Sequence, residues 1–350
     1  MTNIILRAPV YSQSGYGIHS KDIAISLWES QKFNMSISPT HWGGSSVSEE
    51  GMTMMEKEAL FFMTNNKIHK DTSFIFVHVG LPSEFQKIGN VNVGITAGLE
   101  TNKISPEWVN GCNLMDLVIV PSSIIKDNFI SSGVTTKVEV VEEGVDIDIF
   151  NEKPSSIDLL HDISTPINLL SIGQWLPGHI GEDRKGIGLL IDTFLKTFEG
   201  DKKVGLILKT YMNNNSSTDN YLLIERLRNI KMSCPKIHLI HGNLTNEELA
   251  SLYKHSKVKG FVSLTSGEGW GRGIAEAIAC NLPVAVTGWG GHMHYVNPKY
   301  SKLVELTLKQ IPTTLLYNKY FTPDMTWAYP DVQDAKRKMK DLIENPISNK

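Results

Sequence analysis

The chain has 350 residues, of which 41% are hydrophobic, 20% charged and 8% aromatic. This composition supports a large core and two domains of ordinary size, and it excludes a small scaffold, a fibre and a disordered tail. Lys and Arg number 34 against 37 Asp and Glu, so the formal net charge is −3. No global positive field therefore attracts nucleic acid or anionic lipid.

The cysteines and the hydropathy pattern indicate a cytoplasmic protein. Cys112, Cys234 and Cys280 are far apart and lack the spacing of a disulfide framework or a zinc site. The amino-terminal segment has no basic stretch followed by a long apolar run, and no later run approaches the ~20 apolar residues of a membrane span. We therefore expect neither secretion nor a transmembrane anchor.

Short apolar runs alternate with amphipathic stretches, as in a parallel sheet covered by helices on both faces. The strands expected in the first half are 3–6, 33–37, 73–79, 91–96, 117–120 and 137–141. Helices are expected from Tyr16, with Ile23 and Leu27 at helical spacing, and from Pro121 to Gly133. The first half thus predicts one layered α/β domain.

A polar interval at 151–166 interrupts this alternation and predicts a domain boundary. The strands expected beyond it are 168–172, 204–208, 237–240, 258–264 and 284–287. A charged stretch at 331–344 carries an apolar stripe after Pro330 and predicts a final helix. We expect domains at 1–160 and 161–325, followed by a helix and tail at 326–350.

The stretch from Ser263 to Gly288 reads as a strand, a glycine-rich loop, a helix and a further strand. Four glycines let the backbone approach a ligand, and the helix directs N–H groups toward phosphate in the loop: Gly267, Gly269, Gly271 and Gly273. In an open parallel sheet, ligands bind beyond the carboxyl ends of the strands, where this loop lies. Glu268 in the loop and Glu276 on the helix would then face one ligand from two sides.

Carboxylates repel phosphate, so their place beside such a loop needs a reason. Each can accept short, charge-assisted hydrogen bonds from a pair of adjacent sugar hydroxyls. A nucleotide sugar carries such pairs on its ribose and its hexose, with a diphosphate between them. The alternative is that the glycines only permit tight packing and that Glu268 and Glu276 are solvated, which explains a single Gly-Glu-Gly triplet better than the whole pattern.

These residues resemble the donor-site motif of the retaining family 4 glycosyltransferases, the glycosyl transferases group 1, which have the GT-B fold. The motif here is Glu268-x7-Glu276 within Ser-Gly-Glu-Gly-Trp-Gly, followed by Ala-Glu-Ala-Ile-Ala-Cys-Asn-Leu-Pro-Val. Further segments that match in order are Ser14-Gly15-Tyr16-Gly17, Val120-Pro121-Ser122, 141–146 and Asp183-Arg184-Lys185-Gly186. The resemblance covers nearly the whole chain.

The resemblance implies an α/β protein of GT-B fold, with two Rossmann-like domains facing across a cleft and a C-terminal helix that crosses back to the first domain. It implies a hexosyltransferase that moves a hexose from a UDP- or GDP-sugar to an acceptor hydroxyl with retention. Cationic side chains and a helix terminus replace a metal in such enzymes, so neither a cofactor nor a metal is expected.

The resemblance also implies roles for residues of the second domain. Glu276 would bind the ribose diol and Glu268 the transferred sugar, which makes Glu268 a catalytic candidate. The amides of Gly269, Trp270 and Gly271 would bind the sugar and the adjacent phosphate. These three residues and the two glutamates form the expected donor-binding set of the glycine-rich loop.

Four basic residues complete the donor side. Arg184 and Lys185 would clamp the diphosphate, and Arg184 is a catalytic candidate because Gln174 stands where the family often has arginine. Lys209 is either a further phosphate contact or a surface lysine. Arg272 replaces a commonly apolar residue and could contact donor phosphate or an anionic acceptor, or form a surface salt bridge.

Five residues of the first domain are further candidates. His78 ends an apolar run and is either a catalytic residue near the reacting sugar or a structural hydrogen-bonder. Glu100 could meet the acceptor, or it could cap a helix or be solvated, and Tyr16 is expected on the acceptor side. Gly15 and Gly17 nearly match a dinucleotide fingerprint, but its third glycine and its acidic residue are missing, which favours backbone approach to donor phosphate or acceptor.

Two other functions fit the same residues. A sugar-nucleotide epimerase on this scaffold would convert the donor without an acceptor, and a non-catalytic nucleotide or carbohydrate binder would do no chemistry. The acceptor itself is open among a glycan, a lipid-linked, protein or small-molecule acceptor, with DNA disfavoured by the net charge. The oligomeric state is not indicated. The basic side chains at 335–340 favour a solvated helix face over a membrane contact.

Overall fold

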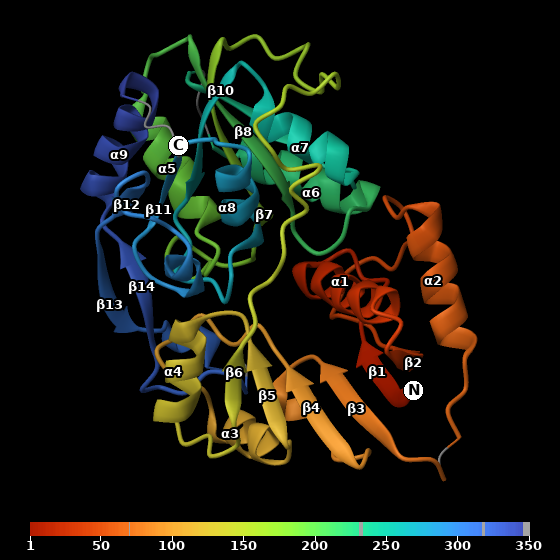
Figure 1. Ribbon diagram of the computed structural model, residues 1–350. Coiled ribbons are helices and arrows are strands. Elements are labelled where there is room, and N and C mark those ends of the chain that lie inside the picture. Colours follow the sequence, from red (N-terminus) through yellow and green to blue (C-terminus); the bar gives the residue numbers. More distant parts are fainter. Residues whose placement is uncertain (70, 231–233, 317–318, 346–350) are drawn as a thin grey trace. The chain divides into compact units, whose positions relative to one another are not determined.

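The computed structural model describes residues 1–69, 71–230, 234–316 and 319–345. The chain divides into two compact units, Met1–Gly144 with Leu316–Met325 and Val145–Leu315 with Thr326–Lys350. Each unit contains a six-stranded sheet in which neighbouring strands pair in parallel (Figure 1). The expected α/β class with two Rossmann-like sheets is confirmed.

Unit 1 has the strand order β2-β1-β3-β4-β5-β6. Its strands are β1 (Thr2–Ala8), β2 (Phe33–Pro39), β3 (Phe74–Val79), β4 (Val91–Ile95), β5 (Leu117–Val120) and β6 (Val138–Val140). Its helices are α1 (Gly15–Glu29), α2 (Met54–Asn65), α3 (Pro106–Asn113) and α4 (Ser123–Ser131), with a 3-10 turn η1 (Pro82–Glu84). All six expected strands are present. Helix α2 lies outside the expected elements, and Thr53 and Glu56 form a capping box at its start.

Unit 2 has the strand order β12-β11-β10-β7-β8-β9. Its strands are β7 (Ile167–Gln174), β8 (Val204–Tyr211), β9 (Lys236–Ile240), β10 (Val258–Ser263), β11 (Val284–Thr287) and β12 (Lys302–Val304). Its helices are α5 (Ile187–Thr197), α6 (Ser217–Arg228), α7 (Asn246–Lys254), α8 (Arg272–Ala279) and α9 (Val332–Glu344), with 3-10 turns η2 (Gly291–His294) and η3 (Thr313–Leu315). β13 (Leu306–Gln310) and β14 (Thr326–Pro330) form a separate two-stranded antiparallel sheet. The two-stranded sheet and β12 lie outside the expected elements.

The structure divides the chain at Gly144 and Val145, earlier than the expected boundary at 160. The polar interval is anchored on unit 2, because Phe150 and Leu160 are buried in one of the unit 2 cores. The Lys254 ammonium also donates a hydrogen bond to the carbonyl of Ile149 at 2.6 Å. A polar composition therefore marks a surface segment here and not a linker between domains.

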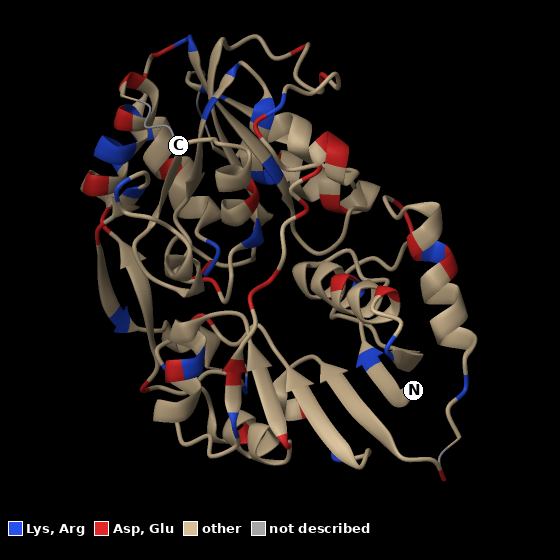
Figure 2. Ribbon diagram, in the orientation of Figure 1, with Lys and Arg blue, Asp and Glu red and all other residues tan. Residues whose placement is uncertain are grey.

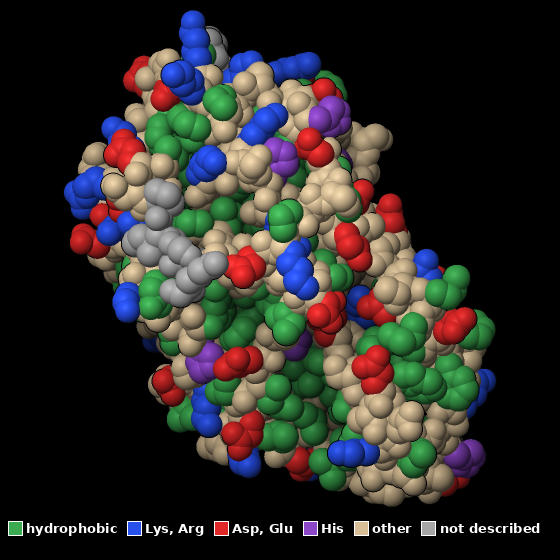
Figure 3. Space-filling view, turned by 45° about the horizontal axis from the view of Figure 1, so that its top comes forward, with side chains coloured by type: hydrophobic (Ala, Val, Ile, Leu, Met, Phe, Trp, Pro, Cys, Tyr) green, Lys and Arg blue, Asp and Glu red, His purple; other side chains and the backbone are tan. Residues whose placement is uncertain are grey.

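Charges of both signs are mixed over the surface (Figures 2 and 3). Figure 2 shows both basic and acidic residues on α9, and the helix takes part in two ion pairs: Arg337 with Asp334, and Asp341 with Lys302 of β12. The basic side chains of this helix are thus interspersed with acids and do not form a single positive face. No helix in the described part of the chain is long and apolar enough to cross a membrane.

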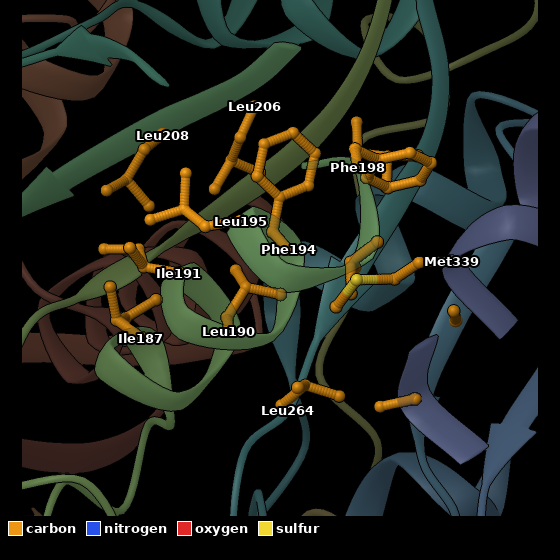
Figure 4. Packing of buried hydrophobic residues seen from close by; sticks show 14 of the residues in the cluster. Ile187, Leu190, Ile191, Phe194, Leu195, Phe198, Leu206, Leu208, Leu264 and Met339 are labelled. Carbon is orange, nitrogen blue, oxygen red and sulfur yellow. The ribbon is translucent and has the colours of Figure 1, made fainter. Parts of the chain in front are cut away.

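Strands of the unit 2 sheet are buried on both faces. On β7, Leu169 belongs to the core beneath α5 and α9, and its neighbour Leu170 to the core beneath α7 and α8. Figure 4 shows the first of these cores, in which Phe194 of α5 and Met339 of α9 lie among the strand side chains. Burial on both faces explains why these strands read as continuous apolar runs.

The expectation that the C-terminal helix crosses back to the first domain is wrong for α9. The helix belongs to unit 2, since Met339 and Leu342 are completely buried in the core that they share with α5. The chain returns to unit 1 earlier, at Leu316–Met325, where the Tyr320 ring lies 5.9 Å from Trp108. Of the helix and tail expected at 326–350, residues 346–350 lie outside the described part of the chain.

Candidate active site

The glycine-rich turn between β10 and α8 is the centre of the candidate site in unit 2. The helix begins at Arg272, and Gly271 before it has a φ of +88°. Glycine alone adopts this conformation at little cost, and a Cβ here would also lie 3.2 Å from the Tyr295 hydroxyl. Among the described residues no side chain caps α8, so the amino end of the helix is suited to an anion.

The turn that follows β7 lies against this glycine-rich turn. Lys185 Nζ is 2.6 Å from Glu268 Oε2, and the two side chains are 20% and 18% exposed. The Arg184 carbonyl accepts hydrogen bonds from the Ser266 amide at 2.7 Å and from the Thr265 hydroxyl at 3.1 Å. The turn after β7 and the turn after β10, about eighty positions apart in the sequence, are thus in direct contact.

Asp183 and Gly186 hold the turn after β7 in position. The Asp183 carboxylate accepts hydrogen bonds from the amide of Ile187 at 2.9 Å and from that of Lys185 at 3.1 Å. Burial raises the pKa of Asp183 above its usual value. Gly186 has a φ of +66°, and a Cβ on it would lie 2.0 Å from the Leu264 carbonyl oxygen, so the close approach of the two turns requires glycine.

Glu276 lies on α8 and is only 6% exposed. Its Oε2 accepts a hydrogen bond from the Tyr253 hydroxyl at 2.9 Å, and its Oε1 lies 3.5 Å from Arg272 Nε. Burial, reinforced by the Glu276 charge, raises the pKa of Tyr253 well above its usual value, so Tyr253 is a hydroxyl donor. Of the roles considered for Arg272, the structure contains the ion pair, which is partly buried.

Lys209 lies near the carboxyl end of β8, beside Ile172 of β7 in the strand register. Burial lowers its pKa to about 8, so it is not an ordinary surface lysine. Two residues further on, burial raises the pKa of Tyr211, and the positive charge of Arg184 opposes this shift. Lys209 and Arg184 are therefore both associated with this edge of the sheet.

A second glycine-rich turn follows β11 and packs against the first. A Cβ on Gly291 would lie 1.7 Å from the Gly269 carbonyl oxygen, so glycine is required for this contact. The Tyr295 hydroxyl lies 2.9 Å from the carbonyl oxygen of Trp270 and 2.7 Å from that of Gly271. These contacts hold the carbonyl groups of residues 269–271 in place, and the amides of the same residues are predicted to bind the sugar and phosphate of the donor.

The sequence interpretation missed this second turn, although a signal was present. Residues 288–291 are Gly-Trp-Gly-Gly directly after an apolar strand, the same arrangement that identified the first turn. His292 follows and is completely buried, with Nε2 at 2.7 Å from the Thr287 carbonyl oxygen. Burial lowers the pKa of His292 below its usual value, while the charge of Glu268 opposes the shift. Tyr253, by contrast, had no local sequence signal.

The predicted glycines of unit 1 differ in what surrounds them. A Cβ on Gly17 would lie 1.9 Å from the Ser12 carbonyl oxygen, which gives this glycine a packing role. The Ser14 hydroxyl accepts a hydrogen bond from the Gly17 amide at 3.1 Å and caps α1. A Cβ on Gly15 would meet no described atom within 4 Å, so the backbone is open to a ligand at this position.

Tyr16 is held at the start of α1. Its hydroxyl lies 3.0 Å from the Thr96 hydroxyl and accepts a hydrogen bond from the Ala97 amide at 2.9 Å. Its ring stacks on Trp42 with centroids 3.7 Å apart and planes inclined by 18°. Burial raises the pKa of the Tyr16 phenol, and the Glu100 charge adds to this, so these two acceptor-side candidates lie in one region of unit 1.

His78 lies on β3 and is only 2% exposed. Its ring is 6.0 Å from that of Phe76 and 5.5 Å from that of Phe85. Burial, with a smaller contribution from the positive charge of Arg7, lowers the pKa of His78 to about 4. The imidazole is therefore neutral at pH 7, and its catalytic role stays a prediction.

The predicted residues thus form two groups, one in each unit. Unit 2 holds the donor-side residues Arg184, Lys185, Lys209, Glu268, Gly269, Trp270, Gly271, Arg272 and Glu276. Unit 1 holds Gly15, Tyr16, Gly17, His78 and Glu100. In unit 2 the structure places the turns after β7, β10 and β11 against one another at one edge of the sheet, where a phosphate-bearing ligand is expected.

Comparisons with known proteins identify one matching family model and several similar structures. Residues 229–306 match the family model described as glycosyl transferases group 1. Sucrose-phosphate synthase from Thermosynechococcus elongatus has a similar structure, with a TM-score of 0.66 and 15% identity over 99% of this chain and 90% of that one. A search of the curated proteins finds no significant match.

Two further solved structures share the fold. The α,α-trehalose 6-phosphate synthase from Burkholderia multivorans has a TM-score of 0.63 and 10% identity over 99% of this chain and 92% of that one. The HepE protein from Anabaena, solved in complex with UDP-glucose, has a TM-score of 0.57 and 15% identity over 85% and 83% of the two chains. These similarities establish the fold as GT-B.

Proposed function

From the match of residues 229–306 to the family model of the glycosyl transferases group 1, and from the GT-B fold of the chain, we propose that the protein is a retaining hexosyltransferase. It moves a hexose from a nucleoside diphosphate sugar to an acceptor hydroxyl. The UDP-glucose held by a protein of this fold makes a UDP-sugar the first donor to test, with a GDP-sugar second.

The observation that carries the proposal is the arrangement of charges around the amino end of α8. Lys185 Nζ and Glu268 Oε2 lie 2.6 Å apart, so a cation and a carboxylate stand side by side. A ligand that carries both phosphate and hydroxyl groups can bind its phosphate to the cation and its hydroxyls to the carboxylate. Glu276 supplies a second, buried carboxylate on the same helix. In the proposal, Glu276 binds the ribose, Glu268 binds the hexose, and Arg184, Lys185 and Lys209 bind the diphosphate.

The reaction breaks the bond between the anomeric carbon and the diphosphate oxygen, and that oxygen receives the bonding electrons. Arg184 and Lys185, together with the amides at the start of α8, stabilise the growing negative charge because they are fixed before the reaction begins. The acceptor oxygen bonds to the same face of the anomeric carbon, which retains the configuration. Its proton passes to the leaving phosphate.

Loss of donor turnover on mutation tests this assignment. Glu276→Gln and Arg184→Ala are expected to lower nucleotide release in the presence of acceptor by at least about 100-fold while the circular dichroism spectrum is unchanged. Glu247→Gln, at an exposed acid of α7, is the matched control and should keep wild-type activity. Wild-type turnover in both site variants would contradict the proposal.

Two further measurements define the reaction class. Transfer is expected to proceed fully in excess chelator, because cationic side chains replace a metal in the proposal; loss of activity that magnesium or manganese restores would reject this part.

Incubation with nucleotide sugar alone should give no epimer, whereas a new sugar nucleotide without any acceptor would indicate an isomerase. Donor turnover of any kind would exclude a purely binding protein.

A further inference from the structure

A pocket of about 350 Å³ lies in unit 1, apart from the donor-side residues in the chain. Arg7 of β1 and His78 of β3 line it, and the strand register pairs these two residues. Glu84 of η1, Gln86 and Trp42 also line it. The pocket therefore opens near the carboxyl ends of β1 and β3, where open parallel sheets bind ligands.

An aromatic platform stands on one side of the pocket. Trp42 lines it, and its ring is stacked on Tyr16, whose hydroxyl is fixed by Thr96 and the Ala97 amide. A large flat ring held in this way offers apolar surface without losing much side-chain entropy when a ligand binds. The C–H face of a pyranose ring packs well on such a surface.

The other lining groups are polar and suited to hydroxyls. The Arg7 guanidinium donates a hydrogen bond to Gln86 Oε1 at 2.9 Å, which leaves the amide nitrogen of Gln86 as a donor. Glu84 is an exposed carboxylate, and among the described residues the buried Nδ1 of His78 has no hydrogen-bond partner. Burial lowers the pKa of His78 to about 4, so the imidazole that lines the pocket is neutral at pH 7.

Two side chains of opposite charge line the pocket. Arg7 contributes one positive charge and Glu84 one negative charge, the His78 ring is neutral, and the other lining residues are Thr40, His41, Trp42, Val79 and Gln86. A phosphorylated ligand would meet the Glu84 carboxylate as well as Arg7, and a long lipid chain would desolvate both charges. A polyhydroxylated, uncharged ligand satisfies donors and acceptors together. The volume is at the low end of the roughly 300–1,000 Å³ of small-molecule sites, which suits the end of a saccharide.

We propose that this pocket binds the acceptor as an unphosphorylated saccharide, with one pyranose ring on Trp42 and its hydroxyls bonded to Glu84, Gln86 and His78. The inference rests on the proposed function, since it names the acceptor class of that reaction. Among the glycan, lipid-linked, protein and small-molecule acceptors that the sequence leaves open, it favours an acceptor that presents a neutral sugar.

The test is a titration of the full chain with methyl α-D-glucopyranoside and maltose as neutral probes and glucose 6-phosphate as the anionic probe, followed by saturation-transfer NMR. The neutral probes are expected to bind, and Trp42→Ala should weaken them about tenfold. Phe61→Ala, at an exposed aromatic residue of α2, is the control and should leave the dissociation constants unchanged.

Glu84→Gln decides between the neutral and the phosphorylated acceptor even if Trp42→Ala fails to fold, because Glu84 is exposed. Loss of this carboxylate should weaken the neutral sugars about tenfold, since charge-assisted hydrogen bonds are lost. Tighter glucose 6-phosphate binding in Glu84→Gln, together with a preference for it over the neutral sugars, would overturn the proposal. Failure of both neutral probes to bind would also overturn it.

UDP binding, followed in the same samples, separates this inference from the proposed function. Trp42→Ala and Glu84→Gln should leave the UDP dissociation constant within about twofold of wild type, because the nucleotide is expected in unit 2. If UDP binds and no neutral saccharide does, the acceptor assignment fails alone. If neither UDP nor GDP binds the wild-type chain, the proposed function fails as well.

Discussion

Glu276 illustrates how one residue depends on groups that are distant in the sequence. Its carboxylate is 6% exposed and would be costly to bury without partners. Tyr253, on the neighbouring helix α7, donates to it at 2.9 Å, and Arg272 lies one helical turn before it. Tyr253 therefore positions the Glu276 carboxylate, which binds the ribose in the proposed function.

Tyr253→Phe should weaken UDP binding about tenfold, because the Glu276 carboxylate loses the hydrogen bond that orients it. Isothermal titration with UDP measures the effect. Tyr221→Phe, at a 61% exposed tyrosine of α6, provides the control. A purely structural role would instead lower the free energy of unfolding and leave the UDP affinity of the folded protein unchanged.

Lys209 carries a positive charge where burial opposes it. Burial lowers the pKa of Lys209 from 10.5 to about 8, so between these pH values Lys209 is protonated in the unfolded chain and neutral in the folded chain. Below pH 8 the lysine is protonated in both states, and the full cost of burying its charge lowers the free energy of unfolding. The free energy of unfolding therefore rises as the pH increases from about 8 to 10.5. A lysine that destabilises the fold at neutral pH is a good candidate for anion binding.

Replacing Lys209 by Met should therefore have opposite effects on stability and binding. At pH 7 the free energy of unfolding is expected to increase by on the order of 2 kcal/mol, and its rise above pH 8 should disappear. UDP affinity should fall about tenfold with the loss of a phosphate contact. Urea titrations from pH 7 to 10 and calorimetry measure both. Lys203→Met, at an exposed lysine, should change neither quantity.

At the scale of elements, the site depends on how two glycine turns pack. The turn after β11 lies so close to the turn after β10 that a Cβ on Gly291 would be 1.7 Å from the Gly269 carbonyl oxygen. Gly186 has the same relation to Leu264, with a Cβ at 2.0 Å from its carbonyl oxygen. The positions of the loop amides are thus set by neighbouring turns as well as by the loop itself.

Gly291→Ala should displace the Gly269 carbonyl and reduce UDP affinity by at least about tenfold, because the loop amides lose their alignment. The matched control is Gly188→Ala in α5, where a Cβ would meet Trp175 Nε1 at an ordinary 3.6 Å. The control should bind UDP normally and gain up to about 1 kcal/mol of stability from helix propensity. Equal UDP affinities in the two variants would show that the turns do not act together.

At the scale of the whole molecule, each unit has its own sheet, its own core and its own group of candidate residues. The chain passes from unit 1 to unit 2 near Gly144, returns to unit 1 at Leu316–Met325 and enters unit 2 again at Thr326, before α9. A ligand that binds one unit is therefore expected to protect that unit first.

Hydrogen exchange with separate ligands tests this division. UDP should slow exchange in the turns after β7, β10 and β11, whereas methyl α-D-glucopyranoside should slow exchange in η1 and at the end of β3. Binding of a ligand stabilises the segments whose opening it prevents, which is the reason for the local pattern. If UDP slows hydrogen exchange in unit 1 and leaves exchange in unit 2 unchanged, the assignment of the donor site is contradicted.

The sequence by itself determined the alternation of strands and helices, because strands buried on both faces must be apolar throughout. It also determined the glycine-rich loop with Glu268 and Glu276, since this motif is local in the chain. Tertiary structure alone decided the support of these residues by Tyr253 and the return of the chain to unit 1. Such contacts depend on packing between segments far apart, which no local pattern encodes.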